Sequence, residues 1–445
     1  MDPEEIRRIV RETNYVTWRR QGGWDPLVLA RAQGSKFWDG AGREYIDLSS
    51  QLIATNLGHG NAAVAEAIAE QARSVAYAAP GFATEARARL SSALTEVLPK
   101  GLSRFFFSTS GTEANEAALK IARAVTGRTK VVARYRSYHG STAASISVTG
   151  EFRRRAIEPL EKVPGTVFAP DCYCYRCPFG RTYPECGVAC AEYVDYQLER
   201  EGDVAAMIVE PVVGTNGVLV PVPEYLPRLR EITKKHGVLL IADEVMSAWG
   251  RVGEWFAVDH WGVRPDLLTT AKGITGAQVP LGLTASTAEV HDAFRDRYFP
   301  HGHTYEAHPL TLAPAVAAIG EYRRLGLLEK SRRDGEYLLR RLGEIRDAHP
   351  SVGEVRGLGL FAAVELVKNR ATREPFNTED DKLAGRPLVV DQVTAAMLRE
   401  GVFCVGWVSH LIVAPPLIVT REELDRALDV LDRSLVVADQ KVVAA

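Results

Sequence analysis

Apolar residues show two different patterns of spacing along this chain of 445 residues. Between about residues 65 and 315, short apolar runs at Lys130–Ala133, Ala205–Glu210 and Val238–Asp243 alternate with helix-spaced stretches such as Tyr225–His236. Short apolar runs are typical of buried strands, and strands that alternate with helices favour a mainly parallel sheet covered on both faces. The pattern predicts an α/β fold whose large domain occupies residues 65–315.

After Pro309 the spacing of apolar residues changes, and longer helical patterns begin. We expect helices at Thr311–Leu325, Glu329–His349, Asp391–Arg399 and from Glu422, and strands at Gly359–Leu366 and Leu411–Ala414. This mixture predicts a smaller α+β domain at residues 316–445. The polar, charged stretch Asn369–Leu388 is expected to be an exposed loop.

The first 64 residues are treated as a third segment, which we expect to join the smaller domain. A helix is expected at Glu4–Asn14 and a hairpin at Ser35–Leu48, which turns around two glycines. A further helical stripe over Asn61–Tyr77 leads into the large domain.

Two functional-looking groups stand at the ends of apolar runs. Asp243 closes one run, and Lys272 follows another at Leu267–Ala271. In an open α/β sheet, sites are built at the carboxyl ends of the strands. A lysine amine can form a Schiff base with an aldehyde cofactor, and a buried carboxylate can keep a pyridinium nitrogen protonated. Taken alone, Lys272 could be an ordinary solvated lysine, and Asp243 could be part of a turn at the end of a strand. Together, the two residues suggest a site for pyridoxal 5'-phosphate (PLP).

A third element lies upstream, where the aromatic run Phe105–Phe107 leads through Ser108–Gly111 into an alanine-rich helical pattern. Backbone N–H groups, hydroxyls and the positive end of a helix dipole would converge there, as a phosphate requires. The turn could equally be a plain helix cap. It lacks the glycine spacing of a dinucleotide-binding turn or a Walker loop.

Seven motifs follow one another in this order: Ser110-Gly-Thr-Glu-Ala-Asn115, Tyr138-His-Gly-Ser141, Glu210-Pro211, Asp243-Glu-Val245, Thr270-Ala-Lys272-Gly273, His303-Thr304-Tyr305 and Ala414-Pro-Pro-Leu417. Their order and spacing resemble the class III aminotransferases, the ω-aminotransferase branch of fold-type I PLP enzymes. The resemblance extends from about Trp38 to about Leu435, and none of the motifs would suffice alone.

The resemblance implies a PLP site made of Ser110, Gly111, Thr112, Tyr138, His139, Glu210, Asp243, Val245, Lys272 and Thr304. Gly111 and Thr112 would hold the phosphate, Tyr138 and Val245 would cover the two faces of the ring, and Glu210 would be an acid beside the cofactor. Lys272 and Asp243 would be catalytic, the first as Schiff-base lysine and proton shuttle, the second as partner of the ring nitrogen. Thr304 would reach the phosphate of a neighbouring subunit, which implies a homodimer with shared sites, or a tetramer built from such dimers.

Composition and charge agree with an enzyme of this class. A hydrophobic content of 46% is ample for a packed core, and a formal net charge of −2 gives no electrostatic footprint for nucleic acid. The charged amino terminus is not a secretory signal, and no run of eighteen apolar residues could span a bilayer. We therefore expect a cytoplasmic enzyme with small-molecule substrates, and neither nucleic acid nor membrane as a partner.

Five of the six cysteines are clustered between Cys172 and Cys190, and the sixth is Cys404. Their spacing is compatible with zinc or an iron–sulfur cluster, but the segment has no nearby histidine. A local disulfide and reduced packing cysteines are the alternatives. We assign no metal ligands and no catalytic cysteine.

The substrate is the least constrained part of the prediction. Many relatives carry a carboxylate-binding arginine before the Pro-Pro-Leu motif, whereas Gly401–His410 contains none. Amine-type relatives often place a tryptophan where this chain has Ile53, and Ser49–Ile53 is more similar to the taurine–pyruvate aminotransferases. We therefore assign Ile53, Trp407 and His410 to the substrate pocket.

The expected reaction is the ping-pong transfer of an amino group from a primary amine, ω-amino acid or amino-sulfonate to an α-keto acid, with pyruvate the expected acceptor. A PLP-dependent aminomutase or racemase would use the same Lys272, Asp243 and Tyr138, because this fold does not determine the reaction type. A PLP-binding regulator without enzymatic activity would usually carry an additional DNA-binding domain, which this sequence lacks.

Overall fold

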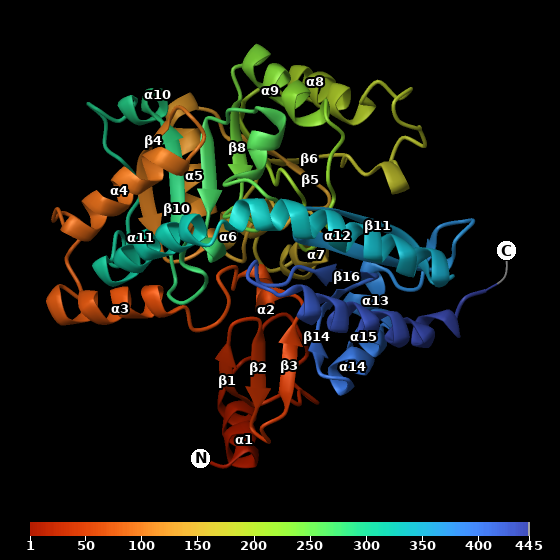
Figure 1. Ribbon diagram of the computed structural model, residues 1–445. Coiled ribbons are helices and arrows are strands. Elements are labelled where there is room, and N and C mark those ends of the chain that lie inside the picture. The colour runs from red at the N-terminus through yellow and green to blue at the C-terminus, as the bar shows by residue number, and fades with distance from the viewer. Residues whose placement is uncertain (444–445) are drawn as a thin grey trace.

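A computed structural model describes residues 1–443 of the chain. A seven-stranded sheet with helices on its faces forms the largest part, and two smaller sheets lie beside it (Figure 1). The predicted α/β class is confirmed.

The large sheet has the strand order β4-β10-β9-β8-β7-β5-β6. Its strands are β4 (Leu102–Ser108), β5 (Lys130–Arg134), β6 (Thr166–Ala169), β7 (Val204–Val209), β8 (Leu239–Asp243), β9 (Leu267–Thr270) and β10 (Gly282–Thr287). Only β10 runs against its neighbours, pairing antiparallel with both β4 and β9. The carboxyl ends of the other six strands therefore meet at one edge, which is where the predicted chemical groups follow the strands.

Helices cover this sheet because their apolar stripes must be buried. Its helices are α4 (Glu85–Val97), α5 (Gly111–Thr126), α6 (Ala143–Ser147), α7 (Phe152–Ile157), α8 (Ala189–Glu201), α9 (Tyr225–Lys235) and α10 (Ala288–Asp292). Helix α5 contacts five strands of the sheet and buries a row of small residues, including Ala114, Ala118 and Ala122. These alanines let the helix approach the strands closely.

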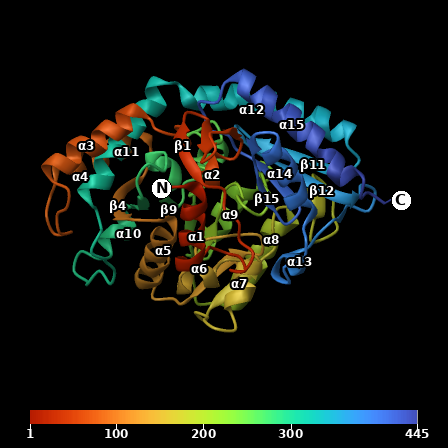
Figure 2. The ribbon, with the colours of Figure 1, turned by 90° about the horizontal axis from the view of Figure 1, so that it is seen from below.

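The carboxyl-terminal part contains two long helices, α11 (Pro309–Arg324) and α12 (Leu327–Ala348), which cross one face of the molecule (Figure 1). A second sheet follows, in the order β11 (Val352–Leu358), β12 (Phe361–Asn369), β16 (His410–Val413) and β15 (Val405–Trp407). The helices α14 (Val389–Arg399) and α15 (Arg421–Asp439) pack beside it (Figure 2).

The amino-terminal segment pairs with this part of the chain. Helix α1 (Pro3–Thr13) precedes the strands β1 (Leu29–Gln33), β2 (Lys36–Asp39) and β3 (Glu44–Asp47), and β3 pairs in parallel with β14 (Val402–Phe403). The short helix α2 (Ser50–Ile53) and α3 (Ala62–Ser74) then lead into the large sheet. The boundaries at residues 64 and 315 stay a prediction, although α11 runs without a break across the second of them.

One expectation about the loops was wrong in part. Residues 369–388 are not a plain loop, because they contain β13 (Glu374–Pro375) and α13 (Glu379–Leu383). Thr378 and Asp381 form a reciprocal capping box at the start of α13, which stabilises this single polar turn of helix without any buried residue.

Candidate active site

The carboxyl edge of the large sheet gathers residues from five of the predicted motifs. Gly111 follows β4, Tyr138 follows β5, Glu210 follows β7, Asp243 ends β8 and Lys272 follows β9. Residues separated by as many as 161 positions in the chain thus lie at one edge because their strands run the same way. This edge is the candidate active site.

Asp243 lies buried at the centre of a hydrogen-bonded group. Its Oδ2 accepts hydrogen bonds from His139 Nδ1 at 2.7 Å and from Asn115 Nδ2 at 2.8 Å, and its Oδ1 accepts one from the Val245 backbone at 3.0 Å. Asn115 in turn accepts a hydrogen bond from the Thr269 hydroxyl at 2.6 Å. These bonds fix the orientation of the carboxylate at the strand end.

The amino terminus of α5 has the features of an anion cradle. Ser110 is the N-cap and accepts a hydrogen bond from the Glu113 backbone at 3.2 Å. In the part of the chain that the structure describes, the N–H groups of Gly111 and Thr112 have no main-chain acceptor, as expected for the first turn of a helix. A Cβ at Gly111 would lie 2.8 Å from Val245 Cγ2, so the cradle and Val245 are in close contact only because residue 111 is glycine.

Glu210 is buried and connects two loops of the site. Its Oε1 accepts a hydrogen bond from the Tyr138 backbone at 3.0 Å, and its Oε2 accepts one from the Gly214 backbone at 2.8 Å. Burial raises the pKa of this carboxyl. Glu210 therefore holds the loop that carries Tyr138 rather than facing solvent.

Lys272 begins a turn of 3-10 helix with φ of 49°, in the left-handed region that a residue with a side chain rarely adopts. Such backbone strain is common at functional sites. Burial lowers the pKa of Lys272 to about 8, and the positive charge of Arg153 acts in the same direction, while Asp243 and Glu210 oppose it. A considerable fraction of this amine is therefore neutral at physiological pH.

A buried arginine, Arg153, lies against the ring of Tyr138. Its guanidinium carbon is 3.6 Å from the Tyr138 ring centroid and 4.5 Å from that of Trp407. Its Nε donates a 2.5 Å hydrogen bond to Glu151, whose pKa burial raises to about 7. Arg153 therefore covers one face of Tyr138, and the Trp18 ring packs perpendicular to the same ring with the two centroids 6.4 Å apart.

The three residues assigned to the substrate pocket have different surroundings. Trp407 and His410 line one cavity of about 220 Å³. Ile53 is buried among Val212, Val218 and other apolar side chains in a separate cluster. The structure brings the first two together but not the third.

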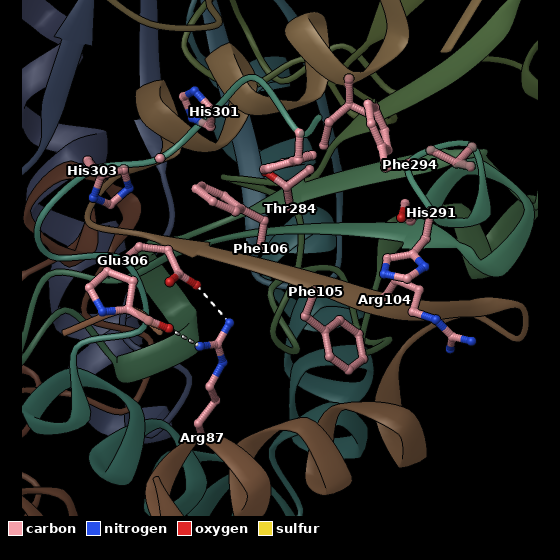
Figure 3. A pocket seen from close by; sticks show the side chains of 16 residues that line it. Arg87, Arg104, Phe105, Phe106, Thr284, His291, Phe294, His301, His303 and Glu306 are labelled. Carbon is pink, nitrogen blue, oxygen red and sulfur yellow. Dashed lines mark hydrogen bonds and ion pairs between the residues drawn. The ribbon is translucent and has the colours of Figure 1, made fainter. Parts of the chain in front are cut away.

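Thr304 has no hydrogen bond from its hydroxyl to Gly111 or Thr112 within residues 1–443, and its side chain is exposed. Its carbonyl accepts a hydrogen bond from Tyr77 at 3.3 Å. The neighbouring residues His303 and Glu306 line a cavity of about 450 Å³ along the edge strand β4 (Figure 3). None of the predicted cofactor-binding residues lines that cavity.

The cysteine-rich segment stands apart from the candidate active site. All six cysteines are free thiols, and Cys172 is hydrogen-bonded to Cys190, which together with burial raises its pKa. Across residues 1–443, no cluster of three or more His, Cys, Asp or Glu side chains is arranged to hold a metal ion. In the same range, no helix is long and apolar enough to cross a membrane.

Sequence reasoning missed several residues of this region. Asn115 lies within a quoted motif, but only the structure shows its contact with Asp243. Arg153 belongs to a run of three arginines that in sequence is typical of a solvated helix face. No sequence signal connects it with Tyr138, because the contact depends on how α7 packs.

The residues present fit PLP. The unpaired N–H groups at the start of α5 suit a phosphate, and the fixed carboxylate of Asp243 suits a protonated ring nitrogen. His139 Nε2 is a buried polar atom without a partner in the described chain, so the site contains a hydrogen-bonding group that a ligand could satisfy. Lys272 adds an amine of lowered pKa.

Comparison with known proteins places the chain in a family of PLP-dependent enzymes, in agreement with the geometry of the site. The family model described as aminotransferase class-III matches residues 19–435, and the chain belongs to this family. It is a PLP-dependent aminotransferase with the fold-type I architecture.

Two relatives and one solved structure illustrate the similarity. The chain is 36% identical to the leucine/methionine racemase of Thermococcus litoralis over 440 residues, which is 97% of this chain and 94% of the relative. It is 33% identical to the taurine–pyruvate aminotransferase of Bilophila wadsworthia over 441 residues, or 94% of each chain. The structure of taurine:2-oxoglutarate aminotransferase from Bifidobacterium kashiwanohense, in complex with PLP and glutamate, is 35% identical and covers 100% of this chain and 99% of that chain, with a TM-score of 0.94.

Proposed function

We propose that the enzyme transfers the amino group of a primary amine, an ω-amino acid or an amino-sulfonate to an α-keto acid, with pyruvate as the expected acceptor. The single observation that carries the proposal is the placement of Lys272, an amine whose pKa is lowered to about 8, at the same strand edge as Asp243. The similarity to a taurine–pyruvate aminotransferase supports this choice of donor and acceptor.

We propose the following roles for the predicted site residues. Bound PLP supplies an aldehyde that condenses with amines and a ring that accepts the electrons released at the substrate carbon. Asp243 holds the proton on the ring nitrogen, and His139 and Asn115 hold Asp243. Lys272 Nζ, neutral for part of the time, is the base that moves a proton to and from the substrate carbon.

The remaining residues bind and orient the cofactor. Ser110, Gly111 and Thr112 would hold the phosphate at the start of α5, and Val245 and Tyr138 would pack against the ring. Glu210 keeps the Tyr138 loop in place through its hydrogen bond to the backbone.

The active enzyme is proposed to be a homodimer. Thr304 is exposed and its hydroxyl makes no hydrogen bond to the cradle of its own chain within the described residues, so this hydroxyl is available to a second subunit. A phosphate bound by one helix terminus has acceptor oxygens to spare, which a hydroxyl donor from the partner would satisfy. Assembly above the dimer and a cytoplasmic location stay predictions.

A panel of donors tests the proposed reaction. The holoenzyme is mixed with each amine and with pyruvate or 2-oxoglutarate, and the loss of donor and the gain of alanine or glutamate are measured. Amine loss that requires the keto acid supports the proposal. A protein that forms neither amino acid with any donor would contradict it.

Racemisation is the second candidate, and the similarity to the leucine/methionine racemase of Thermococcus litoralis favours it. A racemase needs proton transfer at the substrate carbon but no keto acid. Chiral chromatography of L-leucine and L-methionine incubated with holoenzyme, without a keto acid, separates the two: the D-enantiomer appears only if the enzyme racemises.

A further inference from the structure

The turn that carries Lys272 has an unusual backbone conformation. Lys272 begins the 3-10 turn Lys272–Thr275 with φ of 49°, in the left-handed region. Such conformations persist at residues with side chains only where the surroundings hold them in place. The contacts of the next residue, Gly273, therefore help to decide where the Lys272 amine lies.

Gly273 is packed so closely on two sides that no side chain would fit. A Cβ there would lie 2.6 Å from Asn56 Nδ2 and 2.7 Å from Trp249 Cβ. Asn56 comes from the amino-terminal segment, and its Nδ2 donates a 3.0 Å hydrogen bond to the Trp249 carbonyl. Trp249 Nε1 in turn donates a 2.8 Å hydrogen bond to Thr270 Oγ1, two residues before Lys272. Asn56 and Trp249 thus form two walls beside the turn.

A third contact comes from Tyr322 on α11, the helix that runs across residue 315. The Tyr322 hydroxyl donates a 2.7 Å hydrogen bond to the Gly273 carbonyl. The same carbonyl accepts the turn's own hydrogen bond, from the Gly276 backbone at 3.0 Å. Among residues 1–443, no other side chain makes a hydrogen bond to the backbone of residues 272–275. Tyr322 thus joins the turn of Lys272 to a helix of the carboxyl-terminal part.

The Tyr322 side chain is itself held in place. It is fully buried, and its ring centroid lies 6.3 Å from that of Trp249 and 5.9 Å from that of Trp255. Burial raises the pKa of the Tyr322 hydroxyl, so this group stays protonated and remains a donor at neutral pH. The Gly273 carbonyl therefore meets a donor whose position is fixed before any cofactor binds.

We propose that Tyr322 is a positioning residue for Lys272, because its hydroxyl fixes the Gly273 peptide and thereby the backbone that directs the Lys272 amine toward Asp243. The inference rests on the proposed role of Lys272 as the amine that attaches PLP and moves the proton. Small displacements of a reacting group slow the chemical step more than they weaken binding of the substrate. Loss of the hydroxyl should therefore leave the amine in the site but place it less accurately.

The test is a double-mutant cycle of Tyr322→Phe and Lys272→Ala, because such a cycle measures whether one residue acts through the other. Phenylalanine fills the space of the tyrosine ring, and the Gly273 carbonyl keeps its hydrogen bond from Gly276, so the variant should fold. Circular dichroism and thermal unfolding verify that it does.

Three quantities are measured: the rate of covalent PLP capture by the apoenzyme at pH 8, trapped with borohydride; the PLP dissociation constant; and kcat and KM of the holoenzyme. Tyr337→Phe is the matched control. Tyr337 lies on α12 and donates its own hydroxyl hydrogen bond to Asp425, so this variant also loses one such bond, but away from Lys272.

Losing one neutral hydrogen bond should lower both the capture rate and kcat of Tyr322→Phe by about 3- to 10-fold, with KM changed less than about twofold. The PLP dissociation constant should rise by a similar factor when Lys272 is present. In the Lys272→Ala background, Tyr322→Phe should leave the PLP dissociation constant unchanged, because no amine remains to be positioned. Tyr337→Phe should behave like the wild type in every measurement.

A merely structural Tyr322 would weaken PLP binding equally with and without the Lys272 amine, and that result would overturn the inference. A capture rate of Tyr322→Phe equal to that of the wild type would overturn it as well. Both results leave the proposed function intact. Conversely, a wild-type enzyme that transaminates no donor contradicts the proposed function, while the capture rates and PLP dissociation constants still decide the role of Tyr322, since they require no substrate.

Discussion

His139 Nδ1 donates a 2.7 Å hydrogen bond to Asp243 Oδ2, although 104 residues separate the two in sequence. Both side chains are buried, so the bond is shielded from water. It joins the loop after β5 to the end of β8, so the orientation of Asp243 depends on the Tyr138–Ser141 loop as well as on its own strand. A change at either residue should therefore alter the cofactor site as a unit.

Asp243→Asn should keep the fold and lower kcat by at least ~100-fold, because the amide cannot hold the proton on the ring nitrogen while charge develops there. Steady-state kinetics and the PLP dissociation constant measure the effect. Asp266→Asn is the control, since Asp266 pairs with Arg230 at 2.6 Å at the start of β9, away from the strand edge. Activity of Asp243→Asn within threefold of wild type would refute the assignment.

Lys272→Ala should retain PLP only without a covalent bond and should lose turnover, because the amine is both the attachment point and the proton carrier. Borohydride treatment followed by peptide mass spectrometry should label Lys272 in the wild type and nothing in the variant. Lys235→Ala removes an exposed lysine paired with Asp195 and should be labelled at Lys272 like the wild type. Wild-type turnover in Lys272→Ala would disprove the role.

The pH dependence of covalent PLP capture by the apoenzyme should report the lowered pKa of Lys272. Only the neutral amine attacks, so the rate should rise about tenfold per pH unit below pH 8 and level off above it. A solvated lysine, with a pKa near ~10.4, would continue to accelerate up to pH 10. Stopped-flow absorbance, with a free amine as reference for the titration of PLP itself, distinguishes the two profiles.

Much of the fold could be predicted because strand and helix patterns are local properties of the chain. Val238–Asp243 was predicted as a strand and forms β8 (Leu239–Asp243), and Tyr225–His236 forms α9. The order of strands could not be predicted, since β10 (Gly282–Thr287) carries several Thr and Ser residues instead of an apolar run, and no local feature shows that it pairs antiparallel with both β4 and β9. The polar helix α13 was missed because its stability comes from a cap rather than from a buried stripe.

The residues of the candidate site also fall into those that the sequence predicts and those that it does not. Lys272 and Asp243 were found because their chemistry is specific and each follows an apolar run. Arg153 was not, because an arginine on a helix has no pattern that distinguishes a buried guanidinium from a solvated one. Its significance comes from contacts between elements, namely those with Tyr138 and Trp407.

Gly111→Ala should weaken PLP binding by about tenfold, because the added Cβ would lie 2.8 Å from Val245 Cγ2 and one wall of the cradle must move. Cofactor fluorescence during dialysis measures the loss. Gly320→Ala is the matched helical control, since nothing lies within 4 Å of a Cβ there. That variant should bind PLP normally and gain about 0.5–1 kcal/mol in free energy of unfolding, because alanine is the better helix former. Normal retention by Gly111→Ala would argue against the cradle.

Subunit complementation tests the shared site. Chains carrying Lys272→Ala are mixed with chains carrying a disabling change at Thr304, and the hybrids are isolated with two affinity tags. In each hybrid dimer one site receives both defects and the other receives neither, so activity should recover toward half of wild type per dimer. Hybrids that form but remain inactive would contradict the contribution of Thr304 to a neighbouring site.

Among residues 1–443, strand β4 has its only partner in β10, where Ser108 pairs with Gly282. During synthesis at ~5–20 residues per second, the ribosome needs roughly 10 to 35 seconds to make the intervening stretch. Throughout that interval Phe105, Phe106 and Phe107 lie on a strand whose backbone groups have no sheet to join, a state prone to association with other chains. The yield of this enzyme in a cell should therefore depend on chaperones that shield nascent chains, and slower growth at low temperature should favour its recovery in folded form.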